Sequence, residues 1–437
     1  MDTPLLPLTY LLPIGLLLVA WAAVPAARLR ESALAAAVTI LASVVAYLGF
    51  GFALQFGGIG LSSTAPTGLQ GLDKAWSPFT AGAGRWTLIG LEGFFIAGDG
   101  SPTGLALVQS LALHRLPMAI TAGLIPVVAL GDRAHRLAIA AAGVVSTALV
   151  FPIAGAWVWG GGWLATLGIN LNLGHGAIDT AGAGIIFLAS ASVALAALRF
   201  FGRQAAPDTA LPSAARPGLA ALGAIVFGIG WSAWVASDPL LSVYSNIDFA
   251  SVALLGLLGA AAAAFISAAY ILLVTGRIHL LMIARGWLSG WVAVSASALF
   301  IPPGAAIGVG AAAGLMAIIG QHIVQVKWSL NDRAGSLAVF GLAGAWGLIA
   351  LGLFADGAFG AGWNGAAVTG GVRGLFASDP GQLTAQLAAL AAISLFSIGA
   401  STLLLLPVAI LTRRSAKASA VAPEPQPPTT TEDLPAG

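Results

Sequence analysis

Eleven apolar stretches of about 20 residues dominate the sequence and leave it little choice of fold. They lie near residues 6–27, 32–56, 114–131, 137–158, 177–198, 218–236, 249–274, 278–299, 304–326, 335–355 and 383–412. This is the length of an α-helix that crosses a bilayer. The stretches are continuously apolar, without the polar–apolar alternation of a membrane β-barrel. Because backbone polar groups in lipid need partners within the same segment, each stretch is expected to be a helix.

The composition supports this interpretation. Hydrophobic residues make up 58% of the 437 residues, charged residues only 8%, and the mean hydropathy is +0.95. Soluble domains carry about a quarter charged residues, so this chain cannot cover a water-facing surface. The absence of cysteine excludes disulfides and thiolate chemistry. The first stretch has no basic segment before it and is long enough to span, which favours a transmembrane helix over a signal peptide.

Basic residues are distributed unevenly between the two sets of predicted loops. Most Arg and Lys fall on one side, and the other side receives only Lys74, Arg85 and Arg373. By the positive-inside rule the N-terminus is expected outside and the C-terminus in the cytoplasm of a multi-pass protein of the cell (inner) membrane. Residues 57–103 then form a long external loop.

One nonamer pattern occurs twice, at the start of the fifth and tenth stretches. Residues 179–187 read DTAGAGIIF and residues 332–340 read DRAGSLAVF. Repeats five spans apart are inverted in a membrane, with the substrate path at their interface. In each copy the Phe is expected roughly 12 Å deeper along a helix than the Asp. Phe187 and Phe340 are therefore predicted to meet near the bilayer centre.

The fold class predicted from these patterns is all-α: a polytopic membrane protein of eleven transmembrane helices, built as a 5+5 inverted repeat plus an eleventh helix. The membrane domain covers residues 1–414, with repeats over about 6–200 and 216–357 and the eleventh helix over 383–412. Residues 415–437 are rich in Pro and polar residues, which predicts a disordered cytoplasmic tail.

Several segments resemble the ammonium transporter/Rhesus family. WVWGGGWL (157–164) resembles its W-G-G-G segment, GHGAIDTAGAGIIF (174–187) resembles its D-F-A-G-G-x-x-V-H signature, and DRAGSLAVFGLAGAWG (332–347) resembles its D-x-x-x-x-x-x-x-H-G motif. The resemblance implies a homotrimer in the lipid bilayer with one pore in each subunit, and ammonia or ammonium as the substrate.

The main departure from the family concerns the pore. The family's pore has two mutually hydrogen-bonded histidines, and the matching positions here are Phe187 and Phe340. Phenylalanine neither takes up a proton nor hydrogen-bonds, so a proton relay through this pair is excluded. A path lined by the two rings is expected to exclude ions and to pass ammonia or another small neutral solute. The alternative is a non-conducting receptor or assembly subunit with the same fold.

The resemblance also indicates residues that would recruit substrate. Trp159 matches the family's cation-recruiting Trp, and Asp238, with Ser237 as the alternative, lies near its recruiting Ser. Asp179 either stabilises a cation or caps a helix start, and Asp332 is expected to be a structural acid.

Three expectations concern other residues at the pore. Arg115 falls near the mouth, where its charge would repel ammonium unless the side chain snorkels to the headgroups, as we expect. The third stretch shows no aromatic gate residue, offering only Leu113, His114 and Met118. His175 is expected in a solvated loop.

The remaining patterns point to no further chemistry. The histidines lack metal-ligand spacing, and no cofactor, catalytic or nucleic-acid-binding pattern is present. An enzyme is therefore not expected. The tail differs from the ordered segment of members that bind a PII-type regulator, so PII control is doubtful.

Overall fold

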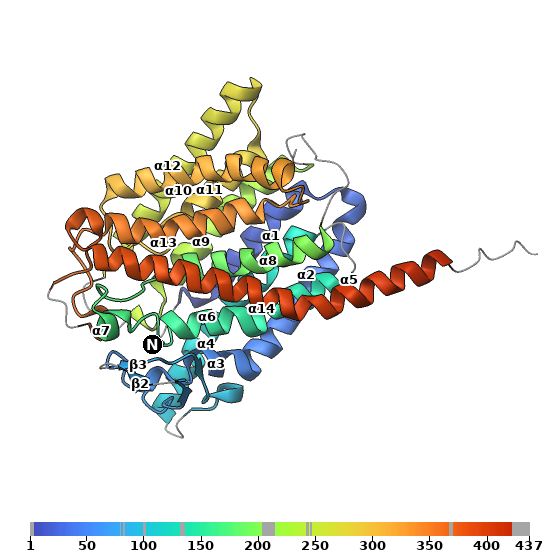
Figure 1. Cartoon of the computed structure of the whole chain (residues 1–437). Coiled ribbons are helices and arrows are strands. Elements are labelled where there is room, and N and C mark those ends of the chain that lie inside the picture. Colours follow the sequence, from blue (N-terminus) through green and yellow to red (C-terminus); the bar gives the residue numbers. More distant parts are fainter. Residues whose placement is uncertain are drawn as a thin grey trace, which may run out of the picture.

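The computed structural model describes residues 4–78, 80–81, 84–98, 102–131, 136–202, 215–241, 244, 247–366 and 370–421. Its longer helices lie side by side in one bundle (Figure 1). The α-helices are α1 (Leu11–Ala23), α2 (Ala26–Ala46), α3 (Phe52–Phe56), α4 (Pro102–Leu130), α5 (Arg136–Val145), α6 (Phe151–Val158), α7 (Leu167–Leu171), α8 (Ala189–Phe201), α9 (Pro217–Ala236), α10 (Phe249–Thr275), α11 (Leu280–Val294), α12 (Pro303–His322), α13 (Ala343–Phe354) and α14 (Pro380–Val421).

Short helical turns extend or connect many of these helices. The 3₁₀ turns are η1 (Leu6–Tyr10), η3 (Ile59–Leu61), η4 (Phe94–Ile96), η10 (Trp363–Gly365) and η11 (Leu375–Ala377). The π-helical turns are η2 (Tyr47–Gly51), η5 (Ser146–Val150), η6 (Ala183–Leu188), η8 (Ile323–Lys327) and η9 (Leu337–Leu342).

The predicted spans correspond to helical segments of the structure. Within the described residues, ten helical segments are long and apolar enough to cross a membrane. The stretch at 278–299 is the exception in length, because α11 has only 15 residues and turns follow it. The all-α, multi-pass class is therefore confirmed.

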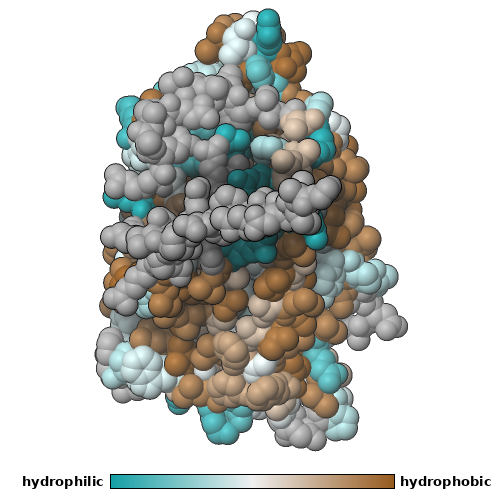
Figure 2. Space-filling view, turned by 90° about the vertical axis from the view of Figure 1, so that its right-hand side faces the viewer, coloured by the Kyte–Doolittle hydropathy of each residue, from teal (hydrophilic) through white to brown (hydrophobic). Residues whose placement is uncertain are grey.

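The outer surface of the bundle is apolar, as contact with lipid requires. Large side chains on α2, α10 and α14 are strongly exposed, among them Val45 at 74%, Leu273 at 85% and Leu395 at 73%. Figure 2 shows apolar residues over large parts of one face. Apolar surface of this extent marks a protein whose surroundings are themselves apolar. By contrast α4 lies at the centre, with 94% of its most apolar window buried.

Small residues allow helices from the two halves of the chain to touch. A Cβ added at Gly15 of α1 would overlap the backbone of Phe227 in α9, and one at Gly230 would overlap the backbone of Leu12. Glycine at such positions lets helix backbones approach closely where no hydrophobic effect drives association. The first helices of the two proposed repeats are thus packed directly on one another.

The expected external loop carries the strands of the described structure. β1 (Ala75–Trp76) pairs antiparallel with β4 (Ile89–Gly90), and β2 (Thr80–Ala81) with β3 (Gly84–Arg85). This segment lies at one end of the bundle (Figure 1). Helix α4 begins at Pro102, so the third span starts about three turns earlier than the hydropathy of residues 114–131 indicates.

The boundary of the expected tail was wrong. Helix α14 continues to Val421, because the Ala-rich segment after the membrane span favours helix, and its end projects from the bundle (Figure 1). The rest of the tail, residues 422–437, lies outside the described residues.

Candidate pore

Two small cavities lie at different depths along α4. The larger, of about 90 Å³, is lined by Arg115, Trp159, Asp179 and Asp238 together with residues of the loops around them. We call it the arginine pocket. The smaller, of about 10 Å³, is lined by Val128, Arg285 and Phe340 among others. Arg115 and Val128 are separated by roughly 20 Å of helix rise.

A buried ion pair joins α4 to the end of α9 in the arginine pocket. Arg115 Nη2 donates to both carboxylate oxygens of Asp238, at 2.9 and 3.0 Å. The two side chains are only 1% and 3% exposed. The expectation that Arg115 snorkels to the headgroups was wrong, because Asp238 gives its charge a partner inside the protein.

Aromatic rings surround the same guanidinium. Its carbon lies 4.5 Å from the ring centre of Trp159, 5.3 Å from that of Trp234 and 5.9 Å from that of Phe56. Trp159 is fixed by a 2.6 Å hydrogen bond from its Nε1 to the carbonyl oxygen of Asp179. Phe56, Trp159 and Trp234 therefore form an aromatic cage around Arg115.

The two candidate recruiting residues that directly follow α9 have different environments. Asp238 lines the arginine pocket and also accepts a hydrogen bond from the Leu240 amide. The Ser237 hydroxyl instead donates to the carbonyl oxygen of Ala233 in the last turn of α9. Of the two, only Asp238 is held toward Arg115.

The repeated nonamers adopt the same local structure. Gly182 and Gly335 have φ of 77° and 76°, a left-handed conformation that suits glycine. Asp179 Oδ2 accepts hydrogen bonds from the amides of Gly184 and Ile185, and Asp332 Oδ2 accepts one from Leu337. Each carboxylate thus satisfies amides at a helix start.

This local structure corrects the expected depth of each Phe. The residues between Asp179 and Gly182 are not helical, and π-helical turns begin at Ala183 and Leu337. Each Phe therefore lies about one helical turn beyond the helix start. The estimate of roughly 12 Å assumed a helix that begins at the Asp.

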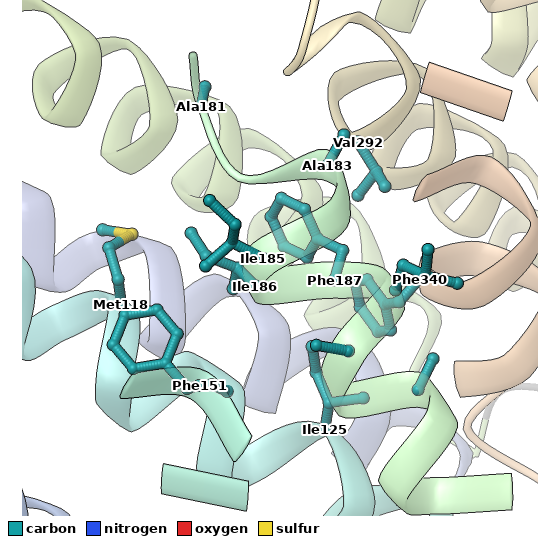
Figure 3. Close-up of a cluster of buried hydrophobic side chains, with 14 of the residues drawn as sticks. Met118, Ile125, Phe151, Ala181, Ala183, Ile185, Ile186, Phe187, Val292 and Phe340 are labelled. Atoms are coloured by element: carbon teal, nitrogen blue, oxygen red, sulfur yellow. The ribbon is translucent and has the colours of Figure 1, made fainter. Parts of the chain in front are cut away.

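The two phenylalanines pack against one another at the centre of the bundle. Their ring centroids are 5.8 Å apart with an interplanar angle of 15°. Phe187 and Phe340 are 0% and 3% exposed, and Figure 3 shows them among Ile125, Ile186 and Val292. The meeting of the two rings that the repeated nonamer predicts is observed.

A second buried arginine lies next to this ring pair. Arg285 of α11 is 1% exposed, lines the small cavity beside Phe340 and donates to the carbonyl oxygen of Arg333. Asp332 is near enough to interact with its charge. Buried arginines therefore lie toward both ends of the central rings, Arg115 in one cavity and Arg285 in the other.

The structure also shows residues that the sequence did not indicate. Trp234 of α9 forms part of the aromatic cage and stacks on His114, with centroids 5.6 Å apart. Phe227 of the same helix packs on Phe187 at 6.2 Å. The spacing of Phe227, Trp231 and Trp234 along one helix was the available signal.

His175 also differs from expectation. It is 0% exposed, and its carbonyl oxygen accepts a hydrogen bond from Asn364. It is therefore a buried residue and not a solvated one.

These features define a multi-pass membrane protein with two small cavities and a stacked Phe pair inside its helical bundle. The model of the Ammonium Transporter Family matches residues 9–418, and the chain belongs to this family. It is 32% identical over 286 residues to ammonium transporter Amt2 of Archaeoglobus fulgidus, which covers 64% of this chain and 60% of that protein. It is 26% identical over 336 residues to an ammonium transporter of Bacillus subtilis, covering 75% and 76% of the two chains.

Solved structures share the fold. A structure titled sensor Amt protein matches with a TM-score of 0.76 at 21% identity, covering 94% of this chain and 92% of that one. Mep2 of Candida albicans matches with a TM-score of 0.73 at 18% identity, covering 94% and 84%.

Proposed function

We propose that the protein is an ammonium transporter-like membrane channel that passes neutral ammonia, or another small neutral solute, and excludes the ammonium ion. The relatives named ammonium transporters support the substrate class. The central Phe pair carries the proposal. The stacked rings of Phe187 and Phe340 offer neither a proton acceptor nor a hydrogen-bond partner to a passing ion.

The cost of moving a charge past these rings supports a neutral solute. A charge at the centre of a bilayer costs about 2.5–3.5 kcal/mol by insertion scales and above about 10 kcal/mol in simulations. Ammonia avoids most of this cost because it is uncharged. Asp238 already pairs with Arg115, so this carboxylate is not free to offset the cost for a passing cation.

Uptake into proteoliposomes at different pH values tests the proposal. With total ammonium fixed, ammonia-dependent alkalinisation of the lumen is measured by stopped flow, and the rate of protein-free vesicles is subtracted. The protein-dependent rate should rise about tenfold per pH unit below the ammonium pKa, because the neutral fraction rises by that factor. A saturable rate that does not change with pH would contradict it.

The alternative function is a non-conducting receptor or assembly subunit. The tight packing of Phe187 on Phe340 favours it, because an apolar stack of this kind also closes a path. In that case the vesicles with protein would take up ammonia no faster than the protein-free vesicles at any pH.

The assembly, orientation and roles of the predicted residues are part of the same proposal. We infer a homotrimer in the cell (inner) membrane, with the N-terminus outside and the C-terminus in the cytoplasm. Trp159 and Asp238 would shape the mouth of each pore, and Asp179 and Asp332 would hold the two helix starts. The mass of the detergent-solubilised protein and protease access to the C-terminus test the assembly and the orientation.

A further inference from the structure

The aromatic cage of the arginine pocket already contains a cation. Three rings from three different segments face the Arg115 guanidinium, with Trp159 nearest at 4.5 Å. A cation within about 6 Å of a Trp ring centre is attracted by the ring quadrupole. This geometry would equally suit an ammonium ion.

We propose that Arg115 is a tethered cation which fills this cage, and that it determines the specificity of the pocket by excluding ammonium ions while admitting a neutral molecule. The inference deepens the proposed function and rests on it for the identity of the path. The pocket itself, with its rings and charges, is independent of whether the path conducts.

The carboxylate that pairs with Arg115 is already engaged. Asp238 offers both of its oxygens to Arg115 Nη2. Asp179 uses Oδ2 to bind the amides of Gly184 and Ile185, while its Oδ1 has no hydrogen-bond partner among the described residues. At Asp238, an incoming cation would approach a carboxylate whose charge Arg115 already balances, and it would meet the like charge of the guanidinium itself.

Arg115 is also held in place. Its side chain is 1% exposed, and its helix α4 is the most deeply buried of the candidate spans in the described residues. Among the described residues, Nε and Nη1 of Arg115 have no hydrogen-bond partner. The guanidinium is therefore held by its ion pair with Asp238 and by the surrounding rings. A side chain that is buried and bonded in this way does not leave the cage to let a cation pass.

The remaining space matches a small neutral molecule. The arginine pocket has a volume of about 90 Å³, whereas a water molecule needs about 10–15 Å³ by the same kind of measure. Ammonia is about the size of water, so it has room beside Arg115 without displacing the guanidinium.

The binding of radiolabelled methylammonium to purified protein in detergent tests this proposal. Equilibrium dialysis compares the parent with Arg115→Gln and Arg115→Gln/Asp238→Asn at matched ionic strength. We expect no saturable binding by the parent at millimolar concentrations. Arg115→Gln should bind at least about tenfold more tightly than the parent, because the cage and Asp238 become free for the ligand. The double variant should bind more weakly than Arg115→Gln, through the rings alone.

Arg85 provides a matched control, since it is exposed and lies outside the pocket lining. Arg85→Gln removes the same charge and should leave binding unchanged. Saturable binding by the parent as tight as that of Arg115→Gln would overturn the proposal, as would a folded Arg115→Gln that does not bind. If Arg115→Gln does not fold, the double variant is compared with the parent instead. It too should bind methylammonium more tightly than the parent, and a folded double variant that does not bind would overturn the proposal. If neither folds, binding by the parent overturns the proposal and its absence upholds it.

This assay is separate from the test of the proposed function. Methylammonium binding in detergent requires no transport, so a failure of pH-dependent uptake does not change its result. Conversely, if the protein passes ammonia but the parent binds methylammonium, the proposed role of Arg115 is refuted and the proposed function stands.

Discussion

Replacing both central phenylalanines by histidine tests whether their apolar rings are the reason that ammonium ions do not pass. Phe187 and Phe340 stack with centroids 5.8 Å apart, which contributes about 0.5–1.5 kcal/mol beyond burial of the rings. One histidine introduced alone buries polar nitrogens without a partner, at a cost of about 1–3 kcal/mol. Two histidines at this separation come within hydrogen-bonding reach once the rings rotate, which recovers about 0.5–1.5 kcal/mol.

The double variant should therefore be destabilised by less than the sum of the two single variants. Unfolding in detergent measures this difference, and ammonium-dependent current on a solid-supported membrane measures function. We expect Phe187→His/Phe340→His to carry clearly more current than either single variant. If the double variant folds like the parent yet carries no more current, the missing histidines do not set the exclusion, and Arg115 is the next group to test.

Further predictions concern the ion pair, the repeated turns and the helix packing. Asp238→Asn should destabilise the protein by about 3–5 kcal/mol, because it leaves Arg115 buried without its carboxylate. The double variant Arg115→Gln/Asp238→Asn should recover part of this loss. Equal melting temperatures for the parent and both variants would contradict this prediction. Gly182→Ala and Gly335→Ala should each cost about 1–2 kcal/mol because φ is positive there, whereas Gly308→Ala in α12, where an added Cβ meets nothing within 4 Å, should not destabilise. Gly15→Val should lower the melting temperature most strongly of the glycine variants, because its side chain would overlap the backbone of α9.

Hydrophobicity and the repeated nonamer made much of this structure predictable. The apolar stretches located the helices because length and hydropathy alone decide whether a helix spans. The pairing of Phe187 with Phe340 followed from equal spacing in two repeats. The helix starts were misplaced because Gly182 and Gly335 adopt positive φ, and a sequence pattern of apolar residues does not distinguish such a turn from helix.

The ion pair in the arginine pocket could not be predicted in the same way. Arg115 and Asp238 are separated by 123 residues, and no local pattern links them. An arginine near the end of a span ordinarily reaches the headgroups, so its partner becomes visible only when α4 and α9 are placed together. The contribution of Trp234 to the aromatic cage depends on the same packing.

The central claim is that neutral ammonia passes and the ammonium ion does not. The number of charges moved per nitrogen atom taken up tests this claim most directly. In one preparation of proteoliposomes, the current on a solid-supported membrane gives the charge, and the uptake of ¹⁵N-labelled ammonium at the same concentration gives the nitrogen. A path that passes only neutral ammonia predicts protein-dependent nitrogen uptake with a charge-to-nitrogen ratio near zero. A ratio near one would show that the ammonium ion, or ammonia together with a proton, crosses past Phe187 and Phe340, and would contradict the account.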